Sequence, residues 1–114
     1  MPHDPRKCLE DIRQAGSLIL TATAGRTHEE YLNDLILRAA VEREFEIIGE
    51  ALNRLHKIDP ALVDQIPEHR RIIAFRNLLA HGYDSVDHEV VWLTIANKLP
   101  ELLRHVETLS AALP

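Results

Sequence analysis

An arginine and a histidine five residues apart are the side chains of this sequence best suited to chemistry. Arg76, Asn77 and His81 fall in one stretch, and Tyr83 follows two residues after the histidine. Histidine exchanges protons near neutral pH, and arginine presents a planar fork of donors that suits phosphate oxygens. Because RNA carries its own nucleophile, the 2′-hydroxyl, these two residue types can cleave it without a metal ion. The stretch is therefore a candidate site for RNA cleavage.

The spacing of these residues has a geometric consequence if the stretch is helical. Residues four apart share a helix face, so Asn77 lies behind His81 and can orient it or bind the substrate. Arg76 and His81 are separated by about 140° around the axis, too far for one helix to aim both at a small target. Two copies facing each other across a two-fold axis can do so. We therefore expect a homodimer with a shared cleft.

The charge around this stretch differs from that of the whole chain, whose formal net charge is −5. Three arginines face a single acid, Glu68, between Ile66 and Tyr83. Arg70 and Arg71 are candidates for contact with an RNA backbone, although a solvated basic turn has the same composition. An arginine near a helix end followed by His-Gly is also typical of a helix cap that complements the helix dipole. The acidic balance excludes a wholly basic nucleic-acid coat but leaves a local basic cleft possible.

Hydrophobic periodicity indicates that helices position these residues. The apolar spacing and the turn residues predict four helical stretches and one short extra turn, at about 5–24, 27–58, 68–81 and 87–109, with the turn at 61–66. Thr27 and Glu30 form a capping-box signature, Gly25 ends the first helix, and Pro100 should kink the last one. No segment alternates convincingly enough for a strand. The expected fold class is all-α, an antiparallel four-helix bundle with an extra short helix.

Length and composition favour one cytoplasmic domain covering residues 1–114. The chain is 46% hydrophobic and 27% charged, as is usual for globular proteins, and only 4% aromatic. Its one cysteine, Cys8, excludes an intramolecular disulfide and is expected in the core. No apolar run is long enough to span a bilayer. The charges at Glu10, Asp11 and Arg13 argue against an exported leader near the N-terminus.

Other polar residues have plainer interpretations. The seven histidines include no HxxxH or HExxH pair, so a preformed zinc site is not expected. His69, His88 and His105 are expected at the surface. Glu42, Glu44, Glu46 and Glu50 are interpreted as a solvated helix face, since only residues four apart align. Gly49 lies inside the second helical stretch, where close packing with another helix would compensate its poor helix propensity.

The segment RNLLAHGYDSVD, followed by VVW and LPELL and preceded by AVEREFEIIGEAL, resembles the HepT-like branch of the HEPN superfamily. The resemblance covers essentially the whole chain. A bare RxxxxH is weak evidence, but RNxxxHxY between these flanks is specific. The resemblance implies an all-α homodimer with the motif at the dimer cleft. It also implies a metal-independent endoribonuclease, without cofactor, that acts as the toxin of a type VII-like toxin–antitoxin pair.

The resemblance assigns roles to individual residues. Arg76 and His81 would be the catalytic pair, and Asn77 the polar residue that follows the motif arginine. Tyr83 would be the tyrosine that a minimal nucleotidyltransferase antitoxin adenylylates with ATP, which would place a phosphate beside a cleft built for RNA. Glu68 and His69 depart from the family, which often has an aromatic residue after Ile-Pro. That departure puts cleft packing and substrate preference in doubt.

Two other functions remain open on the sequence. The chain could be a catalytically inactive HEPN module that binds the nucleotidyltransferase or nucleotides, which would form a tight complex without cleavage. It could also be a structural helical dimer in which the motif is only a cap. Tyr83 could likewise be a ring that covers the end of the bundle.

Overall fold

Helices make up almost all of the folded chain, as the periodicity predicts. The computed structural model describes residues 4–81 and 86–113, without the side chains of Ala80 and His81, and no strand occurs among these residues. Seven helices lie in the described part of the chain: α1 (Pro5–Thr23), α2 (His28–Asn33), α3 (Leu35–Ile58), α4 (Pro60–Val63), α5 (His69–His81), α6 (His88–Asn97) and α7 (Leu99–Ala112). The all-α fold class is confirmed.

The first helix begins and ends where the sequence predicts. Asp4 caps α1 by accepting a hydrogen bond from the Arg6 backbone N–H at 2.8 Å, and Pro5 occupies the first turn, where its missing N–H costs nothing. After α1 ends, Gly25 adopts a φ of 75°. That left-handed conformation suits glycine and turns the chain toward α2.

The prediction of one helix over 27–58 is wrong, because the structure has two helices there. Thr27 and Glu30 do form a capping box, but it starts only the six-residue α2. Asp34 then accepts a hydrogen bond from the Leu37 backbone N–H at 3.0 Å and caps a new helix, α3. Aspartate is a strong N-cap, so a helix boundary forms in the middle of the apolar stripe.

The expected kink at Pro100 is a complete break. The α6 helix ends at Asn97, and α7 starts at Leu99 with Pro100 in its first turn. Proline lacks the N–H that a helix interior requires but fits the first turn of a new helix. The predicted short turn at 61–66 is observed as the four-residue α4.

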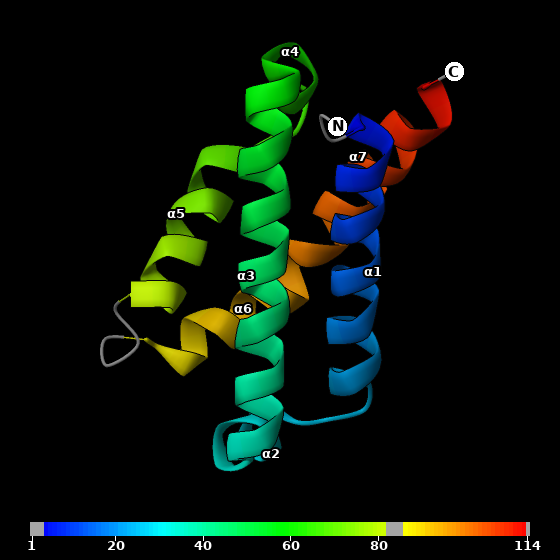
Figure 1. The fold of residues 1–114 in the computed structure, drawn as a ribbon. Coiled ribbons are helices and arrows are strands. Elements are labelled where there is room, and N and C mark those ends of the chain that lie inside the picture. The colour runs from blue at the N-terminus through cyan, green and yellow to red at the C-terminus, as the bar shows by residue number, and fades with distance from the viewer. Residues whose placement is uncertain (1–3, 82–85, 114) are drawn as a thin grey trace.

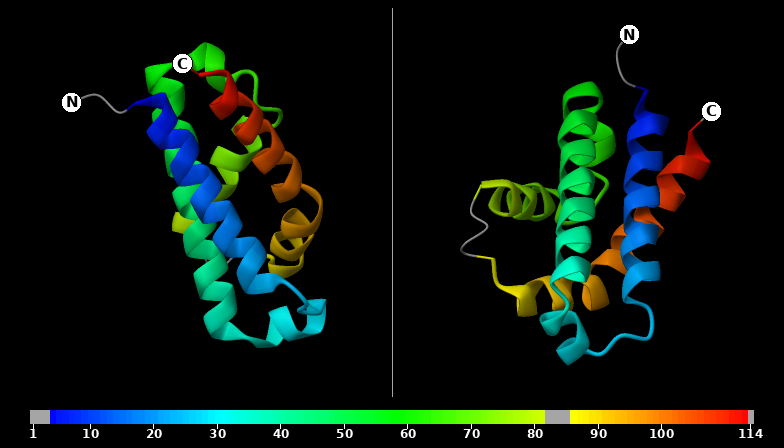
Figure 2. Two further views of the ribbon diagram at one scale, coloured as in Figure 1. Left: turned by 90° about the vertical axis from the view of Figure 1, so that its right-hand side faces the viewer. Right: turned by 60° about the horizontal axis from the view of Figure 1, so that its bottom comes forward.

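The long helix α3 lies between α1 and α5 and packs against both (Figure 1). Both views in Figure 2 show α7 running beside α1. Most of the buried residues lie on α1, α3, α6 and α7, with Cys8 in the core as expected; the most completely enclosed include Leu9, Ile12, Ile19, Ile48, Leu52, Leu55, Val91, Leu99 and Val106. No described helix has the length and apolarity needed to cross a membrane. The arrangement leaves α5 against one side of the bundle, where it carries the motif.

Candidate functional site

The α5 helix places Arg76 directly over Gly49 of α3. A Cβ atom at position 49 would collide with the Cβ of Arg76 and lie 2.5 Å from its Cγ. Any larger residue would therefore push the two helices apart. The predicted close packing at Gly49 is confirmed, and the element that packs there is the one that carries the motif arginine.

Two oxygen acceptors orient the guanidinium group of Arg76. Its Nη2 donates to Oε1 of Glu50 at 3.1 Å, and its Nη1 donates to Oδ1 of Asn77 at 3.0 Å. The side chain of Arg76 is only 27% exposed, and its buried Nε has no hydrogen-bond partner among the described residues. The group is thus held in a fixed position, while its other N–H donors stay available for an anion.

The interpretation of the four glutamates as a solvated face is wrong for Glu50 and Glu42. Glu50 is 35% exposed and pairs with Arg76, and Glu42 is 18% exposed with an oxygen 3.7 Å from Nδ1 of His88. Burial raises the pKa of the Glu42 carboxyl, and nearby His88 partly counteracts this effect. Arg76 on α5 and His88 on α6 partly cover these carboxylates, so helix periodicity alone misassigned them.

Arg76 forms part of an open, polar cleft of about 280 Å³ between α3 and α5. We call it the α3–α5 cleft; it is lined by Glu50, Asn53, Arg54, Lys57, Ile73, Arg76 and Asn77. The four α3 residues were not among the site residues predicted from the sequence. Their spacing of three and four residues was a usable signal, because it places them on one helix face that an adjacent helix can join.

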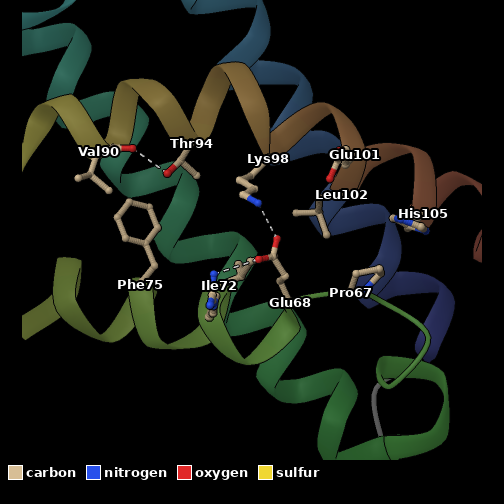
Figure 3. A pocket seen from close by; sticks show the side chains of 11 residues that line it. Pro67, Glu68, Ile72, Phe75, Val90, Thr94, Lys98, Glu101, Leu102 and His105 are labelled. Atoms are coloured by element: carbon tan, nitrogen blue, oxygen red, sulfur yellow. Dashed lines mark hydrogen bonds and ion pairs between the residues drawn. The ribbon is translucent and has the colours of Figure 1, made fainter.

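Arg70 and Arg71 do not line this cleft. Both are exposed in the first turns of α5, and Nη1 of Arg71 lies 3.2 Å from Oε1 of Glu68. Arg71 borders a different cavity of about 300 Å³ between α5, α6 and the start of α7 (Figure 3). The motif arginine and the two preceding arginines therefore lie in different surroundings.

This second cavity, which we call the α5–α7 cavity, is mostly apolar. It is lined by Pro67, Glu68, Arg71, Ile72, Phe75, Val90, Thr94, Lys98, Glu101, Leu102 and His105. An ion pair of 3.0 Å between Glu68 and Lys98 lies at its rim. The hydrogen bond from Lys98 holds the pKa of the Glu68 carboxyl below its usual value.

The remaining predicted site residues lie at or beyond the end of α5. His81 is the last residue of that helix, and its side chain lies outside the described residues. Tyr83 also lies outside them. The helix keeps Arg76 and His81 five positions apart, which corresponds to about 140° around its axis. Of the three histidines expected at the surface, His69 is instead largely buried, at 13% exposure, and its Nδ1 lies 3.0 Å from the Ile66 carbonyl oxygen.

The family model and the most similar known proteins all indicate the same family. The family described as Ribonuclease HepT-like matches residues 8–109. A Thermococcus cleftensis protein named "Probable ribonuclease HepT" is 35% identical over 109 residues, which cover 96% of this chain and 98% of that protein. A provisionally named RNase of Caldanaerobacter subterraneus subsp. tengcongensis is 33% identical, with 90% and 91% covered. Another from Methanocaldococcus jannaschii is 31% identical, with 91% and 85% covered. No solved structure matches.

Proposed function

The chain belongs to the HepT-like ribonuclease family, and on this premise we propose that it is a metal-independent endoribonuclease. One observation carries the proposal for this chain. Arg76 is clamped by Glu50 and Asn77 in a polar cleft, on the same helix that ends at His81. A fixed guanidinium with unused donors is what stabilisation of a phosphorane requires.

The proposed reaction needs no group beyond the RNA and these side chains. His81 acts as a general base that takes the proton from the 2′-hydroxyl, or as the acid that protonates the leaving 5′-oxygen. The 2′-oxygen attacks the adjacent phosphorus, and the bond from phosphorus to the 5′-oxygen breaks. Arg76 stabilises the charge that develops on the pentacoordinate phosphorus. The products are a 2′,3′-cyclic phosphate and a free 5′-hydroxyl.

The proposed enzyme is a homodimer. Arg76 and His81 of one α5 are about 140° apart around the helix axis, so the second copy of the helix completes a cleft with both residue types. Two histidines can then divide the base and acid roles. Gel filtration with light scattering tests this part, and a purely monomeric species would remove it.

Three further polar residues would position the RNA. Asn77, which already binds Arg76, positions the substrate phosphate or His81, while Arg70 and Arg71 make outer contacts with the RNA backbone.

Regulation completes the proposal. The chain is the toxin of a toxin–antitoxin pair, acting in the cytoplasm, where RNA is found. Its partner is a minimal nucleotidyltransferase that uses ATP to adenylylate Tyr83. The added phosphate would repel the RNA phosphates and block the cleft sterically. Intact mass after incubation with that partner and ATP tests this step, because adenylylation adds one AMP to wild type but none to Tyr83→Phe.

The decisive experiment compares wild type with His81→Ala on RNA in the presence of EDTA. We expect wild type to release fragments with cyclic phosphate ends and His81→Ala to be slower by roughly 10²–10⁴. Equal cleavage by both proteins would refute the assignment.

A non-catalytic module is the second candidate, and the ion pair between Arg76 and Glu50 is the observation that favours it. An arginine that only joins two helices would form the same contact. In that case Arg76→Ala lowers the melting temperature, wild type leaves RNA intact, and the nucleotidyltransferase still binds.

A further inference from the structure

The α3–α5 cleft extends well beyond the motif arginine. Asn53, Arg54 and Lys57 continue it along α3 from Glu50, over about 10 Å of helix axis. Three cations line the cleft against one carboxylate, in a chain whose net charge is −5. Because Glu50 is paired with Arg76, the positive charge of Arg54 and Lys57 is not balanced inside the cleft.

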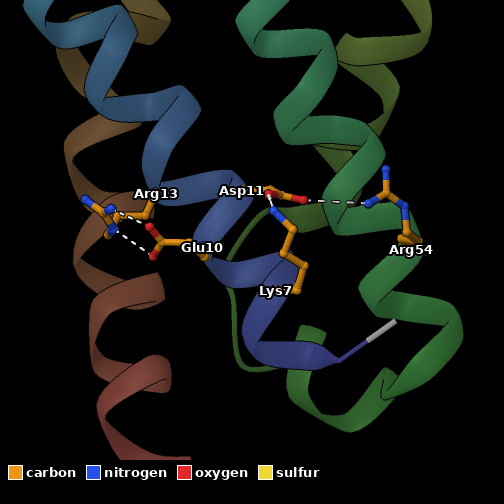
Figure 4. A network of polar contacts seen from close by, with 5 residues as sticks. All are labelled: Lys7, Glu10, Asp11, Arg13 and Arg54. Carbon is orange, nitrogen blue, oxygen red and sulfur yellow. Dashed lines mark hydrogen bonds and ion pairs between the residues drawn. The ribbon is translucent and has the colours of Figure 1, made fainter. Parts of the chain in front are cut away.

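Arg54 has only a weak partner outside the cleft. Its Nη1 lies 3.7 Å from Oδ2 of Asp11, beyond hydrogen-bond distance. Asp11 is bound more closely by Lys7, whose Nζ lies 2.7 Å from Oδ1 (Figure 4). Asp11 is thus shared between two cations, and the guanidinium of Arg54, which donates no hydrogen bond to it, keeps donors for another anion.

Lys57 carries the charge at the far end of the cleft. It lies in the last turn of α3 and forms no ion pair with any of the described residues. A lysine in this position also complements the helix dipole, which would be a purely structural role. Replacing Lys57 distinguishes the two roles, because loss of dipole stabilisation lowers the melting temperature, whereas loss of phosphate binding lowers the affinity for RNA.

We propose that Arg54 and Lys57 bind the backbone phosphates of single-stranded RNA next to the cleaved bond, so that the strand leaves Arg76 toward the carboxyl end of α3. The inference rests on the proposed function and adds the direction in which the RNA strand runs along α3. The cleft is suited to a backbone and not to a base, since its lining is polar apart from Ile73. Arg54 and Lys57 are positioning residues that do not touch the reacting atoms.

Binding is tested with a fluorescein-labelled 2′-O-methyl RNA 20-mer, which lacks the nucleophile and stays intact. The variants are Arg54→Gln, Lys57→Gln and their combination. The matched control is Arg104→Gln, which removes one positive charge from an exposed site on α7 that lines neither the α3–α5 cleft nor the α5–α7 cavity. Fluorescence anisotropy at several salt concentrations gives Kd and its salt dependence.

We expect each cleft variant to weaken binding roughly five- to tenfold and to reduce the slope of log K against log salt by about 0.7, the value for one phosphate on a single strand. The double variant should lose about twice that slope. In cleavage of unmodified RNA, KM should rise while kcat stays at the wild-type value. Arg104→Gln should match wild type in Kd, salt slope, KM and kcat, and circular dichroism melts should show every variant folded.

Three results would overturn the inference. The first is a double variant that binds like Arg104→Gln. The second is a lower melting temperature with unchanged salt slope, which indicates a dipole role for Lys57. The third is competition by poly-glutamate as effective as that by RNA, which assigns the cleft to an acidic polypeptide. If wild type cleaves RNA in EDTA while any of these occurs, only the inference fails; if wild type cleaves nothing, the proposed function fails.

Discussion

The two sides of α5 carry hollows of similar size and opposite character. The α3–α5 cleft, of about 280 Å³, is polar and holds Arg76, whereas the α5–α7 cavity, of about 300 Å³, has apolar walls that include Phe75. Consecutive residues of one helix thus enter different environments, because each step along α5 rotates by about 100°. Charge concentrated in a sequence segment therefore does not establish a single charged site. We expect chemistry on the first side and stability on the second.

The largest effect on kcat should appear when an arginine on each side of α5 is replaced by alanine. Arg76→Ala should lower kcat for RNA cleavage by roughly 10²–10³, because a preorganised donor to the transition state is lost. Arg71→Ala should change kcat less than about threefold and act on KM, since Arg71 is 83% exposed and contacts Glu68. Initial rates in EDTA measure both. Equal losses of kcat would contradict the division between the two sides.

The next effect is a test of the contact between α3 and Arg76. Gly49→Ala should lower the free energy of unfolding by about 2 kcal/mol, since overpacking costs more than the gain in helix propensity. The new methyl group would strike the Cβ of Arg76, which cannot move without its helix. The kcat should fall as well, because Arg76 is displaced.

Gly16→Ala is the matched control for this prediction. Its new Cβ would lie 2.6 Å from Cδ2 of Leu103, the far end of a flexible side chain, so stability should stay within about 0.5 kcal/mol of wild type. Urea denaturation gives both values. If both glycine variants retain wild-type kcat, Arg76 does not require this helix approach.

A smaller effect is expected on the apolar side. Phe75→Leu should lower the free energy of unfolding by about 1 kcal/mol, because the edge-on contact between Phe75 and Phe45, with ring centroids 5.3 Å apart, is lost. The kcat should stay near wild type, since the side chain points away from Arg76 into the other cavity. Thermal melts and initial rates together test this, and a loss of kcat without loss of stability would show that the α5–α7 cavity serves the reaction.

The sequence predicted much of this arrangement. Apolar periodicity and turn residues identified α1, α5 and the all-α class, and Gly49 was correctly expected at a close helix contact. The helices follow from local sequence, and the close contact follows from the missing side chain of Gly49. Residue type and the family motif made Arg76 a candidate site residue, and the structure adds a cleft and two acceptors around it.

What the sequence did not predict depends on how helices rotate against each other. Glu50 and Arg76 are 26 residues apart, and nothing in local spacing indicates that they pair. The sequence assigned no role to Arg54 or Lys57, because the cleft that they line forms only where α5 lies beside α3. Likewise, Asp34 ends a helix inside an apolar stripe, because a side-chain cap competes successfully with helix continuation.

The smallest effect concerns the ion pairs at the rim of the α5–α7 cavity. A hydrogen bond from Lys98 holds the pKa of Glu68 below that of a free glutamate. A lowered carboxyl pKa contributes stability above its unfolded value of about 4.3, and this is lost as pH falls through the folded pKa. Glu68→Gln should therefore melt slightly below wild type at pH 7 and equally at low pH, with kcat unchanged.

The comparison between wild type and Glu68→Gln isolates one carboxyl. Glu10 and Glu30 also have lowered pKa values, through hydrogen bonds from Arg13 and from Thr27, but they titrate alike in both proteins. Glu68 also adopts a positive φ of 61°, and glutamine at this position would carry the same backbone strain. A melting difference that persists at low pH would therefore indicate packing instead of charge. A change in kcat would show that both sides of α5 serve the reaction.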